Sequence, residues 1–230
     1  MGKISWKAGT FIYPIPAVMV SCGTMKESNI ITVAWTGILN TNPAMCYISV
    51  RPERYSHDII KKHGEFVINL TTRDLAYKTD WCGVKSGKNV DKFKEMKLTK
   101  EAGKFVKAPL IKESPVSVEC RVKEIIPLGS HDMFIAEVLS IDVDEKYIDK
   151  KGAFDISKCN LIAYANGGYY PLDKKIGKFG YSVQKKKEKR AKRNSTIIYS
   201  RRCYKMFLFT KNKGRTDSQH SLSAIRFWWK

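Results

Sequence analysis

The strongest constraint on the fold is a pair of alternating segments in the second half of the chain. In residues 116–126 apolar side chains alternate with polar ones, and residues 133–144 largely repeat this order. Alternation is typical of a strand with one buried face, because successive side chains of a strand point to opposite sides. Gly129 and Ser130 supply a turn between the two segments. The pattern therefore predicts an antiparallel hairpin, in which Val116, Val118, Cys120 and Val122 share one face and Ser117, Glu119, Arg121 and Lys123 share the other.

Short β-rich segments account for most of the remaining pattern. Segments 17–22 and 30–35 flank a polar turn and predict a second hairpin, and further short strands are expected at 45–50, 65–70 and 161–164. Helical patterns are few. Because strands and helices do not alternate along the chain, the sequence favours a mainly β fold, an antiparallel barrel with peripheral helices, over a doubly wound sheet.

Two regions outside the strands have weaker patterns. Thr71 or Thr72 can cap a helix over residues 73–81 that Gly83 can end. Residues 84–108 are lysine-rich and predict an irregular segment with one helical turn at most. The expected core contacts of this segment are Phe93, Met96 and Leu98.

The excess of positive charge lies mainly at the C-terminal end. The formal net charge is +20, of which residues 185–230 carry +13 and residues 1–184 carry +7. We therefore expect a folded domain at residues 1–183 and a basic extension at 184–230. A basic arm whose aromatic residues stack on nucleic acid is one interpretation of the extension. A disordered or adventitious segment is the simpler interpretation and is preferred.

The cysteines and the hydropathy pattern narrow the class of protein. The six cysteines occur singly, without a C-x-x-C pair, which predicts reduced, mostly buried thiols and no metal site. Cys82 stands in a more loop-like context than the others, and a structural role is expected for it too. The chain contains no apolar run of about 18 residues, so no membrane span is predicted. The N-terminal residues lack a secretory-signal pattern, so a cytoplasmic protein is expected.

Residues 29–60 combine strand patterns with a candidate anion site. A connection rich in Gly, Asn, Thr and Pro separates segments 30–35 and 45–50, and Arg51 follows the second segment directly. Ser56 precedes a helical pattern and is predicted to be its N-cap. A charged arginine beside the free N–H groups of a helix start suits a phosphate. The alternative interpretation is a hairpin followed by a surface helix. Neither glycine-rich nucleotide-binding motif occurs in the chain.

Several segments together resemble one known family. In order and spacing they are similar to the flavin reductase-like, FMN-binding split-barrel family, in particular its flavoredoxin-type members, over approximately residues 3–181. The resemblance implies a homodimer of antiparallel split β-barrels, with one FMN per subunit at or near the dimer interface. It also implies reduction of FMN by NADH or NADPH and transfer of electrons to free flavin, oxygen, ferric iron or a partner protein. The segments are residues 29–35, Asn42-Pro43, 48–51 with 56–58, 66–70, 80–84, 129–131 before 135–138, and Tyr169-Tyr170.

The resemblance also assigns roles to residues. Arg51, Tyr55 and Ser56, and more weakly His57, would contact the phosphate. Asn29 and residues 32–36 would bond the isoalloxazine edge, where fixed donors favour hydride acceptance. Trp35, Trp81 and His131 are candidates for a stacking wall, and His131 is assigned positioning of the nicotinamide, without proton transfer. The catalytic candidate is His131, and the cofactor-binding set is Asn29, Thr32, Val33, Ala34, Trp35, Thr36, Ser49, Val50, Arg51, Tyr55, Ser56, His57, Trp81 and Cys82.

Ordinary structural roles remain open for several of these residues. Thr32 and Thr36 are common strand formers, Arg51 could form a surface ion pair, and a loop histidine such as His131 is often only solvated. Two functions compete with an NAD(P)H-dependent FMN oxidoreductase. One is an FMN-binding electron carrier without a nicotinamide site, and the other, less favoured, is nucleic-acid binding through the basic extension.

Overall fold

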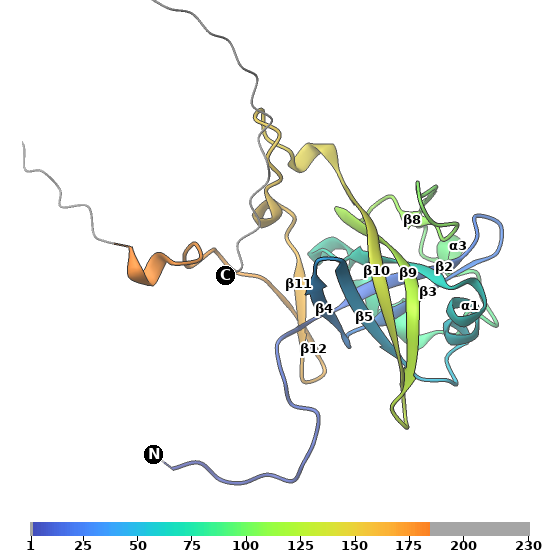
Figure 1. Cartoon of the computed structure of the whole chain (residues 1–230), viewed down its shortest axis with the longest axis horizontal. Coiled ribbons are helices and arrows are strands. Elements are labelled where there is room, and N and C mark those ends of the chain that lie inside the picture. Colours follow the sequence, from blue (N-terminus) through green and yellow to red (C-terminus); the bar gives the residue numbers. More distant parts are fainter. Residues whose placement is uncertain (1, 185–230) are drawn as a thin grey trace, which may run out of the picture. The chain divides into compact units, whose positions relative to one another are not determined.

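A seven-stranded antiparallel sheet forms the body of the protein (Figure 1). The computed structural model describes residues 2–184. Neighbouring strands are hydrogen-bonded in the order β3-β2-β6-β9-β10-β5-β4, so the mainly β fold predicted from the sequence is confirmed. The strands of this sheet are β2 (Val18–Gly23), β3 (Ser28–Val33), β4 (Thr36–Thr41), β5 (Ala44–Val50), β6 (Glu65–Leu70), β9 (Val116–Pro127) and β10 (Asp132–Val143).

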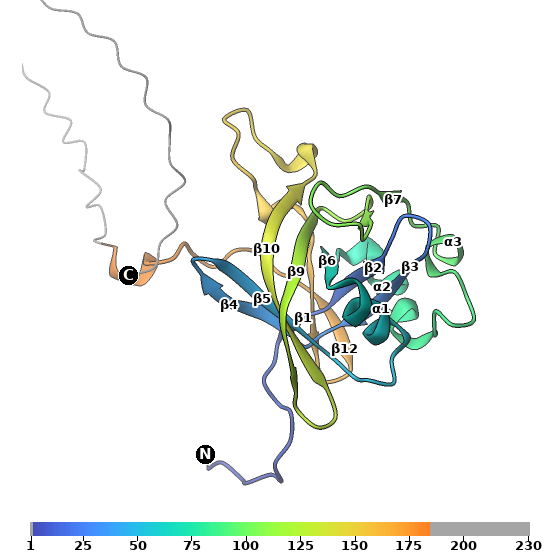
Figure 2. The same cartoon turned by 45° about the vertical axis from the view of Figure 1, so that its right-hand side comes forward.

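The sheet curls into a barrel because its two edge strands are consecutive in the chain. β3 and β4 stand at opposite ends of the strand order, yet only Ala34 and Trp35 join them. The three steps from Val33 to Thr36 span at most about 10 Å, so the two edges must come close together at this point. The backbone N–H of Ser49, on β5, donates to the carbonyl of Trp35 at 2.8 Å and fixes the junction. Figure 2 shows the curved sheet with the helices gathered on one side.

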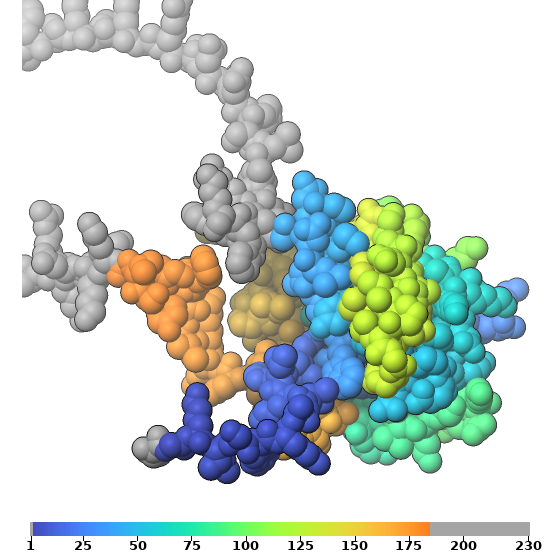
Figure 3. Space-filling view, turned by 60° about the horizontal axis from the view of Figure 1, so that its bottom comes forward, coloured from blue at the N-terminus to red at the C-terminus, as the bar shows by residue number. Residues whose placement is uncertain are grey.

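The hairpin predicted from residues 116–144 is confirmed as β9 and β10, which pair from Asp132 with Pro127 to Val143 with Val116. Figure 3 shows part of this hairpin, in yellow-green, beside the light-blue β4–β5 segment. The polar face is not simply exposed, because Ser117 and Glu119 are buried. The Glu119 carboxylate accepts the backbone N–H groups of residues 104–106 at 2.8–3.0 Å. An irregular segment therefore covers this face, which alternation alone cannot indicate.

The interpretation of residues 30–50 as one hairpin is wrong. The residues between the two predicted strands form a strand of their own, β4, which pairs with β5, whereas β3 pairs with β2. The side chains of Ile38 and Leu39 are exposed on β4. A strand without a buried face lacks the alternation of apolar and polar residues by which strands are recognised in a sequence. For this reason β4 was not predicted. The hairpin of β2 and β3 is confirmed.

Helix α1 (Tyr55–His63) begins two residues earlier than predicted, and Ser56 is not its N-cap. Arg54 occupies that position and makes no side-chain cap bond. Ser56 is buried, and its hydroxyl oxygen accepts a hydrogen bond from Nδ2 of Asn29 at 2.8 Å. The helix ends at Gly64, whose φ of 68° is in the left-handed region. The first turn of α1 is therefore fastened to β3 through Asn29.

The second helical region agrees with the predicted cap but extends further. The Thr72 hydroxyl accepts the N–H of Leu75 and starts a 3-10 helix, η1 (Arg73–Leu75), which continues into α2 (Ala76–Val84). Gly83 lies inside α2 and does not end it. The predicted single turn in the lysine-rich segment is α3 (Lys92–Glu95).

The two largest apolar clusters of the described residues hold these elements together. The larger fills the barrel, and α1 contributes Ile60 to it. The smaller lies beneath α2 and α3 and includes Phe93 and Leu98, with Met96 packed against it, as predicted. Cys82 is buried in this cluster on α2, so the expectation of a loop-like context was wrong. The cysteines within the described residues are free and buried, as predicted.

The remaining elements lie outside the main sheet. The strand and Asn-Gly-Gly turn expected near residue 164 are confirmed in a three-stranded sheet, ordered β1-β11-β12. The predicted basic extension lies, except for residue 184, outside the described residues. Within residues 2–184, no helix is long and apolar enough to cross a membrane. The elements not yet named are β1 (Ile15–Pro16), β7 (Lys100–Glu101), β8 (Leu110–Ile111), β11 (Ile162–Ala165), β12 (Gly168–Pro171), η2 (Glu145–Tyr147), η3 (Ile156–Lys158) and η4 (Tyr181–Val183).

Candidate functional site

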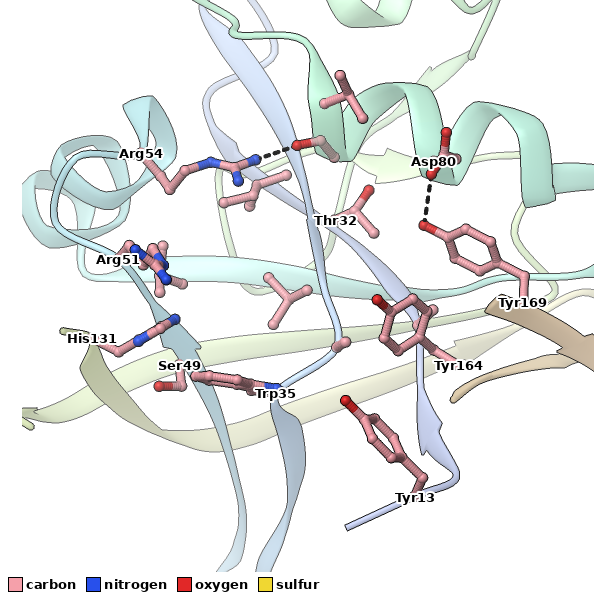
Figure 4. A pocket seen from close by; sticks show the side chains of 17 residues that line it. Tyr13, Thr32, Trp35, Ser49, Arg51, Arg54, Asp80, His131, Tyr164 and Tyr169 are labelled. Atoms are coloured by element: carbon pink, nitrogen blue, oxygen red, sulfur yellow. Dashed lines mark hydrogen bonds between the residues drawn. The ribbon is translucent and has the colours of Figure 1, made fainter. Parts of the chain in front are cut away.

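A hollow of about 380 Å³ opens where the β3–β4 junction meets α2 and β12 (Figure 4). One wall is the backbone of residues 31–35, which comprises the end of β3 and the bend that leads to β4, and α2 approaches this wall closely. A Cβ added at Gly83 would lie 3.2 Å from Cβ of Thr32, so the glycine permits the approach. This first hollow is lined by Tyr13, Ala17, Ile31, Thr32, Val33, Ala34, Trp35, Ser49, Val50, Arg51, Arg54, Asp80, Gly83, Val84, His131, Tyr164 and Tyr169.

Trp35 and His131 form one side of the first hollow. Their ring centroids are 4.3 Å apart. Oγ of Ser130 lies 3.0 Å from Nδ1 of His131 and steadies the imidazole. Burial, assisted by the nearby Arg51 guanidinium, lowers the pKa of His131 below its ordinary value. The imidazole is therefore held predominantly neutral near pH 7, where it can donate or accept a hydrogen bond.

The opposite side is aromatic and was not predicted in full. Tyr164 and Tyr169 pack edge to face with centroids 5.4 Å apart, and Tyr13 packs against Tyr164. The Tyr169 hydroxyl donates to the carboxylate of Asp80 at 3.2 Å. Burial and the Asp80 charge raise the pKa of Tyr169 to about 12, so its phenol stays protonated. The sequence signalled Tyr169 through its position after a turn, but nothing in the sequence placed Tyr13 or Asp80 beside it.

Arg54 joins the first hollow to a second one. Its Nη2 donates to the carbonyl of Gly83 at 2.6 Å, as Figure 4 shows, and ties the start of α1 to the end of α2. Ile31, Arg54 and Val84 line both hollows, which are therefore adjacent. Arg54 was missed from the sequence, where it is one of two arginines just before a helix.

The second hollow, of about 260 Å³, is strongly cationic. Its key residue is Lys92, which is 3% exposed and whose Nζ donates to the carbonyls of Ile30 and Cys82 at 2.7 Å each. Lys92 makes no ion pair within the described residues, and burial lowers its pKa to about 8. The hollow is lined by Asn29, Ile31, Glu53, Arg54, Tyr55, Ser56, Val84, Lys85, Ser86, Gly87 and Lys92.

This arrangement suits an anion. An ammonium has three N–H donors, and carbonyl groups take up two of those of Lys92 without neutralising its charge. Burying a charge without a counter-ion is costly, so an anionic ligand would relieve that cost. The second hollow also contains the first residues of α1, whose N–H groups favour negative charge.

Most residues predicted from the sequence are brought together by these two hollows. Thr32, Val33, Ala34, Trp35, Ser49, Val50, Arg51 and His131 line the first, and Asn29, Tyr55 and Ser56 line the second. Several of them also use their side chains in contacts within the protein or at its surface. The Thr32 hydroxyl donates to the carbonyl of Thr79 at 2.5 Å, and Arg51 forms an exposed ion pair with Glu53 at 3.3 Å.

Four predicted residues line neither hollow. Thr36 donates its hydroxyl to the carbonyl of Tyr47 at 2.6 Å. Trp81 packs against the smaller apolar cluster, where Cys82 is also buried. His57 is a buried residue of α1, with Nε2 2.8 Å from the carboxylate of Asp132 and Nδ1 3.0 Å from that of Asp58. Their positions indicate structural contacts.

Comparison with known proteins identifies the family of this chain. Residues 10–173 match the family model described as a flavin reductase like domain. The structure resembles flavoredoxin of Desulfovibrio vulgaris (Miyazaki F), with 30% identity, 80% of this chain and 100% of that chain covered, and a TM-score of 0.74. Flavoredoxin from Methanosarcina acetivorans has 28% identity, the same coverage and a TM-score of 0.72. An uncharacterized protein of Pyrococcus abyssi is 32% identical over 150 residues, 65% of this chain and 83% of its own length.

Proposed function

The chain belongs to the flavin reductase-like family, and on that premise we propose that it is an oxidoreductase that binds FMN, accepts hydride from NADH or NADPH and passes electrons to an acceptor. Membership of the family supports a flavin-related redox function. The acceptor is proposed to be free flavin, ferric iron, oxygen or a partner protein. The apolar side chains exposed on β4, Ile38 and Leu39, support the proposal of a homodimer.

The observation that carries the proposal is the adjacency of the two hollows, which share Arg54. A space lined by the backbone of residues 31–35 and by aromatic rings adjoins a space lined by Lys92, a buried ammonium that makes no ion pair within the described residues. FMN has the same order of parts, a flat ring system followed by a ribityl chain and a phosphate. The residues of the two hollows therefore fit FMN both in their chemistry and in the order of the two subsites.

The phosphate end of the cofactor is assigned to the second hollow. Lys92 and Arg54 would supply charge, and the buried Ser56 hydroxyl would supply a hydrogen bond. This assignment differs from the expectation that Arg51 binds the phosphate, because Arg51 lines only the first hollow. We therefore assign Arg51 to the ring end, where its charge would favour negative charge on the reduced ring.

The ring end is assigned to the first hollow. Bound FMN would supply the group that accepts hydride and releases electrons to an acceptor. The backbone of residues 32–35 would bond the edge of the ring, and the Trp35–His131 stack would provide the surface that orients the nicotinamide. The neutral His131 is assigned hydrogen bonding and positioning. Exclusion of water falls to Tyr164 and Tyr169 on the opposite side.

The decisive experiment is anaerobic reduction of the reconstituted protein. We expect purified protein to take up FMN and the visible band of oxidised flavin to bleach on addition of NADH or NADPH. Uptake without bleaching by either nucleotide would support the electron carrier in place of the reductase. Failure to take up FMN would refute the proposal. A protein truncated after Tyr181 that still binds and reduces FMN would show that the basic extension is not needed for this function.

A further inference from the structure

The first hollow has two ends of opposite charge, as Figure 4 shows. Arg51 and Arg54 lie at one end, together with His131. Asp80, an exposed residue of α2, lies at the other end and is the only acidic residue among the described residues that line this hollow. The arginine end therefore favours an anionic group on a ligand, and the Asp80 end disfavours one.

Three tyrosines gather at the Asp80 end. Tyr13 precedes β1, Tyr164 lies on β11 and Tyr169 lies on β12, and their rings pack edge to face. The Tyr169 hydroxyl donates to Asp80, whereas the hydroxyls of Tyr13 and Tyr164 form no hydrogen bond within residues 2–184. Figure 4 shows both of these hydroxyls pointing into the hollow. This end therefore offers a ligand aromatic surface and two available phenol groups.

These groups together select a flat, uncharged molecule that carries carbonyl oxygens. Aromatic side chains pack favourably against other planar rings. A phenol O–H group donates a hydrogen bond, which a carbonyl oxygen accepts. A carboxylate or phosphate on the ligand would approach the Asp80 charge, and this repulsion would reject it. A quinone has all three properties, since it is flat, uncharged and carries two carbonyl oxygens.

We propose that the Asp80 end of the first hollow binds a neutral quinone as electron acceptor, with Tyr13 and Tyr164 as hydrogen-bond donors to its oxygens and Asp80 as the residue that excludes anionic acceptors. The inference rests on the proposed function, to which it adds a class of electron acceptor. A nicotinamide dinucleotide carries a pyrophosphate, which the charges of Arg51 and Arg54 would draw to the other end of the hollow.

The reaction at this end is a two-electron transfer. The anionic reduced flavin loses a hydride, whose bond to the ring breaks as an O–H bond forms at one carbonyl oxygen of the quinone. Water gives a proton to the other oxygen, so the products are oxidised flavin, the hydroquinone and hydroxide. Negative charge develops on the second oxygen before it is protonated, and hydrogen bonds from Tyr13 and Tyr164 stabilise that charge.

The test measures binding of two probes to the oxidised, FMN-loaded full chain by isothermal titration calorimetry. Duroquinone is the neutral probe. The anionic probe is a trimethylbenzoquinone that carries a propanoate in place of the fourth methyl group. We expect wild-type protein to bind duroquinone at least about tenfold more tightly than the anionic probe.

The substitution Asp80→Asn tests the origin of this preference. It removes the charge and keeps an oxygen that can accept the hydrogen bond of Tyr169. The preference for the neutral probe should fall by at least about fivefold. The matched control is Asp74→Asn, at an exposed position that does not line the hollow, and it should leave the preference unchanged.

The double variant Tyr13→Phe/Tyr164→Phe tests the two donors. It removes both hydroxyls and keeps both rings, so duroquinone binding should weaken by about fivefold or more. The control is Tyr170→Phe, at an exposed position of β12 that does not line the hollow. It should change duroquinone binding by less than about twofold.

The outcomes separate the inference from the proposed function. If FMN binds and a nicotinamide nucleotide reduces it but duroquinone does not bind, the quinone inference is overturned and the proposed function stands. Equal effects of Asp80→Asn and Asp74→Asn, or of the double variant and Tyr170→Phe, would also overturn it. If the double variant raises the KM for NADH or NADPH and leaves duroquinone binding unchanged, this end binds the nucleotide and the inference is overturned. If FMN does not bind, both proposals fail.

Discussion

The imidazole of His131 lies on the indole of Trp35 with ring centroids 4.3 Å apart and planes inclined at 39°. The two residues come from distant parts of the chain, the β3–β4 junction and the turn between β9 and β10. Both line the first hollow, at its Arg51 end. The pair therefore has the position expected of a surface that orients a flat ring.

The substitution His131→Ala should slow flavin reduction by about tenfold or more, because it removes a contact that positions the nicotinamide. It should change the FMN dissociation constant by less than about threefold, because the backbone of residues 32–35 stays intact. Anaerobic stopped-flow reduction with NADH and NADPH measures the first quantity. The control is Leu128→Ala, an exposed residue of the same turn. Equal single-turnover rates for wild type and His131→Ala would show that the histidine has no part in reduction.

The substitution Arg54→Ala should weaken FMN binding more than Arg51→Ala. Arg54 lines both hollows and is part-buried, whereas Arg51 is exposed and paired with Glu53. Loss of charge-assisted bonds of about 1.5–3 kcal/mol corresponds to a rise of roughly 10–100-fold in the dissociation constant. Riboflavin, which lacks the phosphate, should be affected less than FMN. If Arg51→Ala weakens FMN binding more than Arg54→Ala, the result would support phosphate binding at Arg51, as first expected from the sequence.

FMN binding should weaken as the pH rises through about 8, where the ammonium of Lys92 loses its proton in the free protein. A bound phosphate would raise that pKa, so binding takes up a proton above pH 8, and affinity should fall by at most about tenfold per pH unit. Titrations from about pH 7 upward keep a phosphate of pKa about 6 ionised. Lys92→Met should bind FMN weakly with a flat profile. An equally steep profile in this variant would exclude Lys92 as the titrating group.

The substitution Glu119→Ala should lower the free energy of unfolding by about 2–4 kcal/mol, because three backbone N–H groups at residues 104–106 would lose their acceptor. Chemical denaturation measures this change. Glu124→Ala, at an exposed position of the same strand, is the matched control and should change stability by less than about 0.5 kcal/mol. Similar losses in both variants would mean that the carboxylate does not hold the covering segment.

Hydrophobic periodicity predicted the strands of the barrel that have one buried face. It failed to predict a strand whose side chains are mostly exposed, and it failed to identify a residue that is buried outside any periodic pattern. The strand at 65–70 was predicted with its observed bounds, and β4 was missed because its side chains are mostly exposed. Lys92 shows the limit for the site. It stands among exposed lysines in a segment without pattern, and only the packing of α3 against β3 places its ammonium between the carbonyls of Ile30 and Cys82. No local signal separates it from Lys94 two residues later.

Ser56 and His57 are neighbours in the first turn of α1, and they serve different parts of the molecule. Ser56 lines the second hollow and bonds Asn29, while His57 contacts Asp132, which directly follows His131. The anion end and the Trp35–His131 end of the site are thus linked through two consecutive residues of one rigid turn. We therefore expect a displacement of that turn by a bound anion to reach His131 through Asp132, so that the contributions of the two ends to binding need not add.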